Sequence, residues 1–151
     1  MFFAIDPNPP QRRKRLENAD ISGKRILVVE DNELNIEIAE YILKEAGASV
    51  EKAENGKAAL EQYQISEEGY YDAILMDLMM PVMDGYTATK KIRSLEHSDA
   101  KTIPIIAMTA NAFQEDAEKC IAVGMNAHLA KPLDIEKMMT TICHLVKKKN
   151  E

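Results

Sequence analysis

Short apolar runs alternate along the chain with segments whose apolar residues recur at helical spacing. Residues 25–30 (RILVVE) are rich in Val, Ile and Leu, which is typical of a strand buried on both faces. Residues 34–46 instead carry apolar side chains at positions 34, 38 and 41–43, and Gly47 then favours a helix end. The same reading predicts strands at 25–30, 49–53, 73–76, 103–108 and 127–130, and helices at 34–46, 57–65, 86–95, 113–123 and 134–146.

Strict alternation of short apolar strands with helices predicts an α/β fold. The expected architecture is a doubly wound parallel sheet with helices on both faces, because right-handed crossovers leave few other layouts. In such sheets, ligands bind at the carboxyl ends of the strands, beside a topological switch point.

Residues 1–23 differ from the rest of the chain. They contain three prolines, the basic run 12–15 (RRKR) and a Ser-Gly pair at 22–23. This composition predicts a linker, followed by one domain over residues 24–147 and a short tail over 148–151.

Charge and cysteine content narrow the class of protein. A net charge of −6 argues against nucleic acid or an anionic membrane as the main partner. Cys120 and Cys143 lie in helical patterns and form no C-x-x-C motif, so a reducing cytoplasm is expected. No apolar run approaches the roughly 20 residues that span a bilayer, so no direct membrane insertion of this segment is expected.

Polar residues follow the predicted strands at the end where ligands bind. Glu30 and Asp31 end the first strand, Asp77 ends the third, Thr109 the fourth and Lys131 the fifth. Taken singly, each of these residues is explained as a helix cap or a solvated side chain. Their shared position at one edge of the sheet favours a functional site.

The charges in this group predict a divalent cation. Two carboxylates 4 Å apart repel by about 1 kcal/mol in water and about 4 kcal/mol at an intermediate dielectric. Lys131 neutralises one of the three negative charges, and the remaining two suit one cation. Hard oxygen ligands without nearby His or Cys favour Mg²⁺ or Mn²⁺ over zinc. The alternative is that one carboxyl group stays protonated with a raised pKa.

Such a group suits phosphoryl transfer. Asp77 is the best candidate nucleophile, since it stands alone on the middle strand between the other charged residues. Lys131 and the cation would stabilise phosphoryl oxygens, and the Thr109 hydroxyl is a natural donor to one of them.

These residues lie in motifs that resemble the receiver domains of two-component response regulators. The resemblance covers residues 24–146. Its motifs are residues 27–32 (LVVEDN), 76–85 (MDLMMPVMDG), 104–110 (PIIAMTA) and 129–132 (LAKP). It implies a flavodoxin-like (βα)5 three-layer sandwich with strand order 2-1-3-4-5.

The resemblance also implies roles for single residues. Asp77 is expected to be the phosphoacceptor and, with Asp31, a direct ligand of Mg²⁺. Glu30 is expected to reach the ion through water, and the backbone carbonyl of Met79 to be a further ligand. Met79 also lies where the family tunes dephosphorylation.

Further family positions surround the phosphoryl group. Thr109 is expected to be the switch hydroxyl and Lys131 the phosphate-binding lysine, with a cis peptide bond between Lys131 and Pro132. Ala110 is small and should leave the site open to water or a partner, and Asn111 occupies a second position that tunes dephosphorylation.

One position departs from the family pattern. Many members carry Tyr or Phe three residues before the lysine, whereas this chain has His128, which we interpret as a partly buried packing residue. The amino-acid sequences of these motifs most resemble those of receivers at the C-terminus of hybrid sensor histidine kinases. Residues 2–8 then resemble the tail of a kinase domain, and the expected partner is a histidine kinase phosphoacceptor domain or a histidine phosphotransfer protein.

Three competing functions remain open from the residues. A phosphatase of the haloacid dehalogenase type requires an acid two residues after the nucleophile, where this chain has Met79. A flavin-binding module requires a Gly/Ser/Thr-rich phosphate loop, where this chain has the acidic run 30–33. A degenerate receiver that acts only in docking is disfavoured, because all five key positions are present.

Overall fold

The computed structural model describes residues 21–110 and 114–149. Strands and helices alternate through this part of the chain, as the apolar pattern predicts. The elements are β1 (Arg25–Val29), α2 (Glu33–Glu45), β2 (Ser49–Ala53), α3 (Gly56–Ile65), β3 (Ala73–Asp77), α4 (Gly85–Arg93), β4 (Ile105–Thr109), α5 (Gln114–Val123), β5 (Ala127–Ala130) and α6 (Ile135–Lys149).

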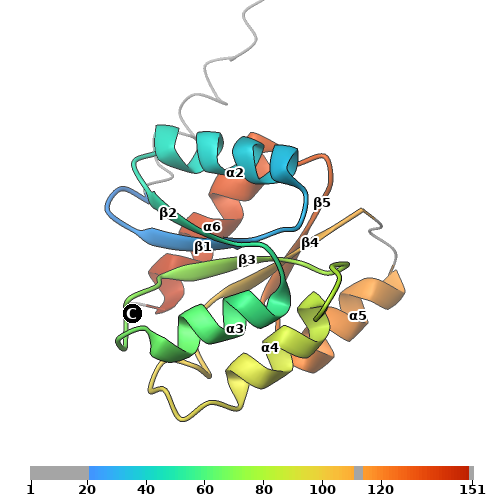
Figure 1. Cartoon of the computed structure of the whole chain (residues 1–151). Helices are drawn as coiled ribbons and strands as arrows, with labels where there is room; N and C mark the ends of the chain where they lie inside the picture. Colours follow the sequence, from blue (N-terminus) through green and yellow to red (C-terminus); the bar gives the residue numbers. More distant parts are fainter. Residues whose placement is uncertain (1–20, 111–113, 150–151) are drawn as a thin grey trace, which may run out of the picture.

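The strands form one parallel sheet in the order β2-β1-β3-β4-β5, which confirms the expected order. Helices α2 and α6 cover one face of the sheet, and α3, α4 and α5 cover the other (Figure 1). The chain is therefore a three-layer sandwich with its switch point between β1 and β3, where successive connections turn to opposite sides.

Alternate residues of the central strands fill two separate cores. In β1, Ile26 and Val28 pack toward α2 and α6, while Leu27 and Val29 pack toward α3 and α4. All four side chains are fully buried, which explains why this strand reads as a continuous apolar run rather than an alternating one.

Three of the helices that follow strands begin with a polar cap. The side chains of Asn32, Asn55 and Asp84 accept hydrogen bonds of 3.0, 2.8 and 2.8 Å from the backbone N–H three residues on. These caps satisfy donors that the first helical turn leaves without partners. They also set where α2, α3 and α4 begin relative to the carboxyl edge of the sheet.

Most element bounds lie within one residue of the predicted ones, and three differ by two or more. Helix α4 ends at Arg93 rather than at 95. Strand β4 begins at Ile105 rather than at 103, because Pro104 has no N–H to donate to a ladder. Helix α6 continues to Lys149, three residues beyond the predicted end.

Packing against the domain begins before the predicted boundary at Lys24. The side chain of Ile21 is fully buried in the core beside α2 and α6, and the Gly23 N–H donates to the Gly47 carbonyl. The remainder of the predicted linker, residues 1–20, lies outside the described residues. Within the described part of the chain, no helix has the length and apolar character of a membrane span.

Candidate functional site

A cleft of about 310 Å³ lies at the carboxyl edge of the sheet. Two neighbouring strands bring its acids together: Val29 pairs with Met76, so the residues that follow, Glu30 and Asp77, lie level with each other. The cleft is lined by Glu30, Asp31, Asn32, Asn35, Asp77, Met79, Ala110 and Lys131.

Three carboxylates meet in this cleft. Glu30, Asp31 and Asp77 each offer one oxygen, and these oxygens all lie within 4.8 Å of one another. Glu30 and Asp77 are buried, whereas Asp31 is exposed. The group therefore has a buried side against the sheet and an open side toward solvent.

Lys131 joins the two buried acids. Its Nζ lies 2.7 Å from Glu30 Oε2 and 3.1 Å from Asp77 Oδ1. Strand β4 separates β5 from β3, so the ammonium must cross the end of one strand to reach Asp77, and the long lysine side chain makes this possible. The Lys131 N–H donates to the Thr109 carbonyl at 2.8 Å, and the Lys131–Pro132 peptide bond is cis.

The proton affinities of the two buried acids move in opposite directions. Burial and the neighbouring charge of Glu30 raise the pKa of Asp77 from 3.8 to about 6. Burial alone would also raise the pKa of Glu30, but its contacts with Lys131 and Asp77 outweigh this and lower it. In the same way, both carboxylates outweigh burial and raise the pKa of Lys131. Without a cation, a proton entering the group is therefore held on Asp77.

The donor set fits a hard divalent cation. The three converging side chains supply only carboxylate oxygen, and Lys131 leaves a net charge of −2 when all are ionised. Oxygen-only sites of this kind suit Mg²⁺ or Mn²⁺. The raised pKa of Asp77 reflects the same crowding of negative charge, which a bound cation would relieve.

The remaining predicted residues lie around the cleft. Thr109 is buried at the end of β4, next to the strand that carries Asp77, and Ala110 lines the cleft. The backbone N–H of Met79 lies 3.4 Å from Asp77 Oδ1, while its side chain is 77% exposed and apolar. Asn111 lies outside the described residues.

His128 does not have the packing role that the sequence suggested. It lies on β5, an edge strand, and its side chain is exposed. The interpretation of a partly buried residue was wrong, because strand alternation at this edge turns Leu129 inward and its neighbours outward.

Sequence reasoning missed the contact that seats the end of β3 against α4. A Cβ atom added to Gly85 would overlap the carbonyl oxygen of Asp77, so the first residue of α4 must lack a side chain. The Gly85 N–H donates to the Leu78 carbonyl and closes the base of the loop between them. At its tip Val82 has φ 71°, a conformation that favours glycine. The available sequence signal was the Asp84-Gly85 pair. Such a pair indicates a turn, but it does not show which residue the glycine packs against.

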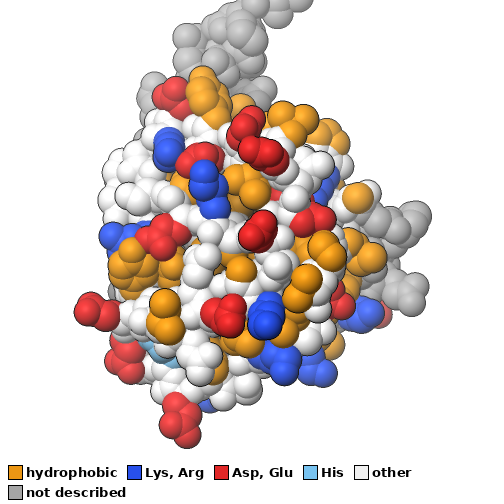
Figure 2. All heavy atoms as spheres, in the orientation of Figure 1, with side chains coloured by type: hydrophobic (Ala, Val, Ile, Leu, Met, Phe, Trp, Pro, Cys, Tyr) orange, Lys and Arg blue, Asp and Glu red, His pale blue; other side chains and the backbone are white. Residues whose placement is uncertain are grey.

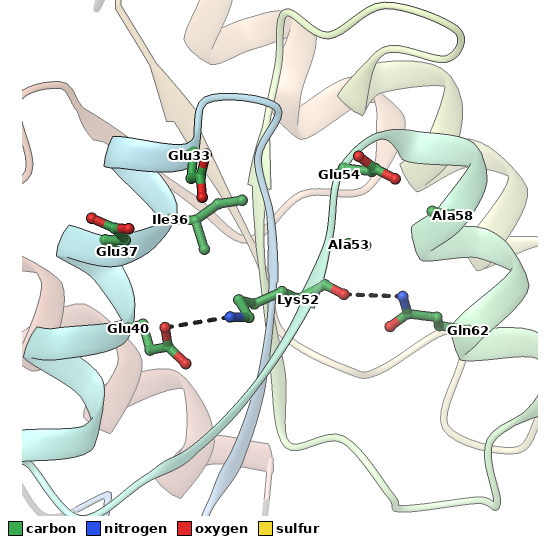
Figure 3. Close-up of a pocket in the computed structure, with 9 residues that line it drawn as sticks. All are labelled: Glu33, Ile36, Glu37, Glu40, Lys52, Ala53, Glu54, Ala58 and Gln62. Atoms are coloured by element: carbon green, nitrogen blue, oxygen red, sulfur yellow. Dashed lines mark hydrogen bonds and ion pairs between the residues drawn. The ribbon is translucent and has the colours of Figure 1, made fainter.

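A second hollow, of about 400 Å³, lies between α2 and α3 beside the edge strand β2 (Figure 3). Lys52 of this strand pairs with Glu40, and its carbonyl accepts a hydrogen bond from Gln62. Other glutamates on its rim do not converge, and within the described residues only the first cleft gathers three possible metal ligands. The converging acids are therefore those of the first cleft, at the carboxyl edge of the sheet.

Comparison with known proteins agrees with this geometry. The family model described as "Response regulator receiver domain" matches residues 26–143. The chain belongs to this family. Receiver domains act in two-component and phosphorelay signalling, and the sheet order described above is that of a receiver.

The curated relatives are histidine kinases. Histidine kinase 2 of Arabidopsis thaliana is 37% identical over 151 residues, which cover 88% of this chain and 13% of that protein. Probable histidine kinase 1 of Oryza sativa subsp. indica is 36% identical over 143 residues, covering 76% of this chain and 14% of that protein. The receiver chain thus spans only a small part of these relatives.

Solved receiver structures share the fold. The receiver domain of sensor histidine kinase PA1611 from Pseudomonas aeruginosa, solved with a magnesium ion in its active site cleft, has a TM-score of 0.75 and 40% identity. That match covers 83% of this chain and 99% of the other. The chemotaxis protein CheY4 of Vibrio cholerae has a TM-score of 0.73 and 30% identity, covering 81% and 98%.

Proposed function

We propose that this receiver accepts a phosphoryl group from a phosphohistidine onto Asp77 in a cation-dependent reaction. The observation that carries the proposal is the contact of one ammonium group, Lys131 Nζ, with both Asp77 and Glu30 beside a third carboxylate. A nucleophile, a fixed positive charge and a cation-binding group then share one small cleft. The module itself is a signalling switch rather than an enzyme that turns over a separate substrate.

The transfer step forms one bond and breaks one. A carboxylate oxygen of Asp77 attacks phosphorus, the N–P bond of the phosphohistidine breaks, and the imidazole nitrogen keeps the electron pair. Since the pKa of Asp77 is about 6, most molecules carry the ionised nucleophile at neutral pH and need no separate base. Lys131 would move from Asp77 toward a phosphoryl oxygen, and the Thr109 hydroxyl would donate to another.

Glu30, Asp31, Asp77 and the Met79 carbonyl would hold Mg²⁺ or Mn²⁺. When bound, the ion supplies positive charge that offsets repulsion between the acidic group and the incoming phosphoryl oxygens. The exposed Asp31 leaves the group open to solvent, so that an ion can enter without opening the core.

The partner is proposed to be the phosphoacceptor domain of a histidine kinase or a histidine phosphotransfer protein. Helix α2 begins beside the cleft and exposes an apolar stripe of Leu34, Ile38 and Tyr41, which are 63%, 42% and 66% exposed. Figure 2 shows apolar side chains at the surface along this helix. A stripe at this spacing suits a partner helix, and Asn32 and Asn35 at the start of the helix line the cleft itself.

The parent protein is proposed to be a hybrid histidine kinase of the cytoplasm or its membrane face. In that arrangement residues 9–23 would form the linker between kinase and receiver, and residues 24–147 the receiver. The phosphoryl group would then alter the receiver's conformation or pass to a phosphotransfer protein.

Intact-mass spectrometry after incubation with Mg²⁺ and acetyl phosphate tests the proposal. We expect one added phosphoryl group that hydroxylamine removes, as an acyl phosphate requires. EDTA and Asp77→Asn should each abolish it, whereas Asp134→Asn should not, because asparagine also caps a helix. A hydroxylamine-stable adduct, or one that persists in Asp77→Asn, would overturn the assignment.

A further inference from the structure

A second group of charged side chains lies at the opposite edge of the sheet from the phosphoacceptor cleft. It joins the loop between α3 and β3, residues 66–72, to the loop between α4 and β4, residues 94–104. Both loops precede the strands β3 and β4, whose other ends carry Asp77 and Thr109. The residues at its centre are His97 and Asp99.

Asp99 accepts hydrogen bonds from both sides of this junction. The Tyr63 hydroxyl of α3 donates to its Oδ1 at 2.6 Å, and the Gly69 N–H donates to its Oδ2 at 3.0 Å. His97 Nδ1 lies 2.8 Å from the same Oδ1. These contacts stabilise the ionised form and lower the pKa of Asp99, although burial opposes them.

The second ring nitrogen of His97 also faces an acceptor. Its Nε2 lies 2.6 Å from the carbonyl oxygen of Ser66, in the opposite loop. A carbonyl can only accept, and the ionised carboxylate of Asp99 can only accept. Neutral imidazole carries one N–H and can satisfy only one of these two groups, whereas imidazolium satisfies both.

The other groups around His97 favour the same protonation state. Glu68, in the opposite loop, accepts from the Ser98 N–H, and its charge also acts on the ring. The Tyr63 ring packs at a centroid distance of 4.9 Å. Arg93, a cation of α4 near this junction, donates to the carbonyls of Gly124 and Ala100 and to the side-chain oxygen of Asn126. The hydrogen bond to Ser66, followed by the contact with Asp99, raises the pKa of His97 despite burial.

We propose that His97 is a pH-sensitive latch: as imidazolium it ties the α3–β3 loop to the α4–β4 loop, and loss of one proton releases one of the two contacts. In the neutral ring, a lone pair on one nitrogen would face an oxygen that cannot donate. The latch lies outside the phosphoacceptor cleft and does not depend on the function proposed above. It secures the loop that follows α4, the helix whose first residue abuts Asp77.

The sign of the effect follows from the raised pKa of His97. A group that binds its proton more tightly in the folded state contributes full stability below its unfolded pKa, near 6.5. That contribution to stability is lost as the pH rises through the higher pKa that His97 has in the folded protein. The His97→Gln variant, whose side chain does not titrate, should therefore differ most from the parent protein in acid and least in alkali.

Thermal unfolding of the parent protein, His97→Gln and His144→Gln from pH 5.5 to 9 tests the latch. His144 is exposed on α6 and serves as the matched control. We expect His97→Gln to lower the Tm by about 3 °C at pH 6 and by less than about 1 °C at pH 9. His144→Gln should leave the pH dependence unchanged. A Tm difference that does not vary with pH in the expected direction would overturn the latch.

A second measurement uses the parent protein alone and does not require a variant to fold. Long-range proton–nitrogen NMR correlations report whether each ring nitrogen of a histidine carries a proton. At pH 6.5 we expect both nitrogens of His97 to be protonated, with a midpoint above the ordinary imidazole value of about 6.5. A neutral His97 ring at this pH, or a midpoint at or below about 6.5, would overturn the proposal. The spectra are recorded in EDTA and without a phosphodonor, so that phosphorylation of the cleft does not contribute to the result.

Discussion

Replacing Asp77 with asparagine is expected to stabilise the metal-free protein at neutral pH. Burial and the charge of Glu30 raise the pKa of Asp77 to about 6 from an ordinary 3.8. At 1.36 kcal/mol per pKa unit, this difference corresponds to about 3 kcal/mol of unfavourable free energy for the ionised side chain in the folded state. Asparagine keeps the shape and removes the charge, but it also loses attraction to Lys131, so we expect a gain of about 1–3 kcal/mol.

The pH dependence of this gain follows from proton linkage. The folded protein holds a proton on Asp77 between about pH 4 and 6, where the unfolded chain has lost it. Stability of the parent protein therefore falls over this range, while the asparagine variant lacks this loss. Urea unfolding of both proteins in EDTA should show a free-energy difference that grows from pH 4.5 to 6.5 and is constant above it.

Magnesium should narrow this difference in stability. Mg²⁺ at about 100 times its Kd stabilises a folded protein by about 2.7 kcal/mol. The variant has one fewer carboxylate in the group and should gain less. If Asp77→Asn is less stable than the parent protein in EDTA at pH 7.5, or if the difference does not change with pH, the electrostatic account of the cleft is refuted.

Three substitutions test the packing around the site by urea unfolding. Val82→Gly should stabilise the protein by about 1 kcal/mol, because the left-handed backbone strains a β-branched residue whose side chain is 76% exposed; a loss of stability would contradict this. Gly85→Ala should destabilise it by about 2 kcal/mol and slow phosphorylation by acetyl phosphate, because the new Cβ overlaps the Asp77 carbonyl; an unchanged rate would show that the strand end tolerates displacement. Arg93→Met should destabilise it by about 2–4 kcal/mol, because the carbonyl of Gly124 loses donations of 2.7 and 3.0 Å; a change below 0.5 kcal/mol would show that water replaces them.

Local pattern was sufficient for the elements and for the edge of the sheet where the acids and Lys131 gather. Continuous apolar runs mark strands that are buried on both faces, and period-3.6 spacing marks the buried side of each helix; both signals depend only on neighbours in the sequence. The strand ends at Glu30, Asp77, Thr109 and Lys131 follow from the same pattern. Parallel strands then bring their carboxyl ends together whatever the details of packing. The strand order itself came from motif resemblance.

Only the tertiary structure decided how these residues act on one another. Lys131 and Asp77 are 54 positions apart, and their contact depends on how far β5 and β3 are separated by β4. The raised pKa of Asp77 comes from burial and from a charge on another strand, neither of which is a property of its sequence neighbours.

The same reason explains what the sequence concealed elsewhere. The contact of His97 with Ser66 spans 31 positions and requires two loops to meet. The exposure of His128 depends on β5 lying at the sheet edge. Sequence by itself therefore determined the alternation of elements and the residues available for chemistry. The folded chain determined which of them share protons and charge, because these interactions depend on distance and burial in space.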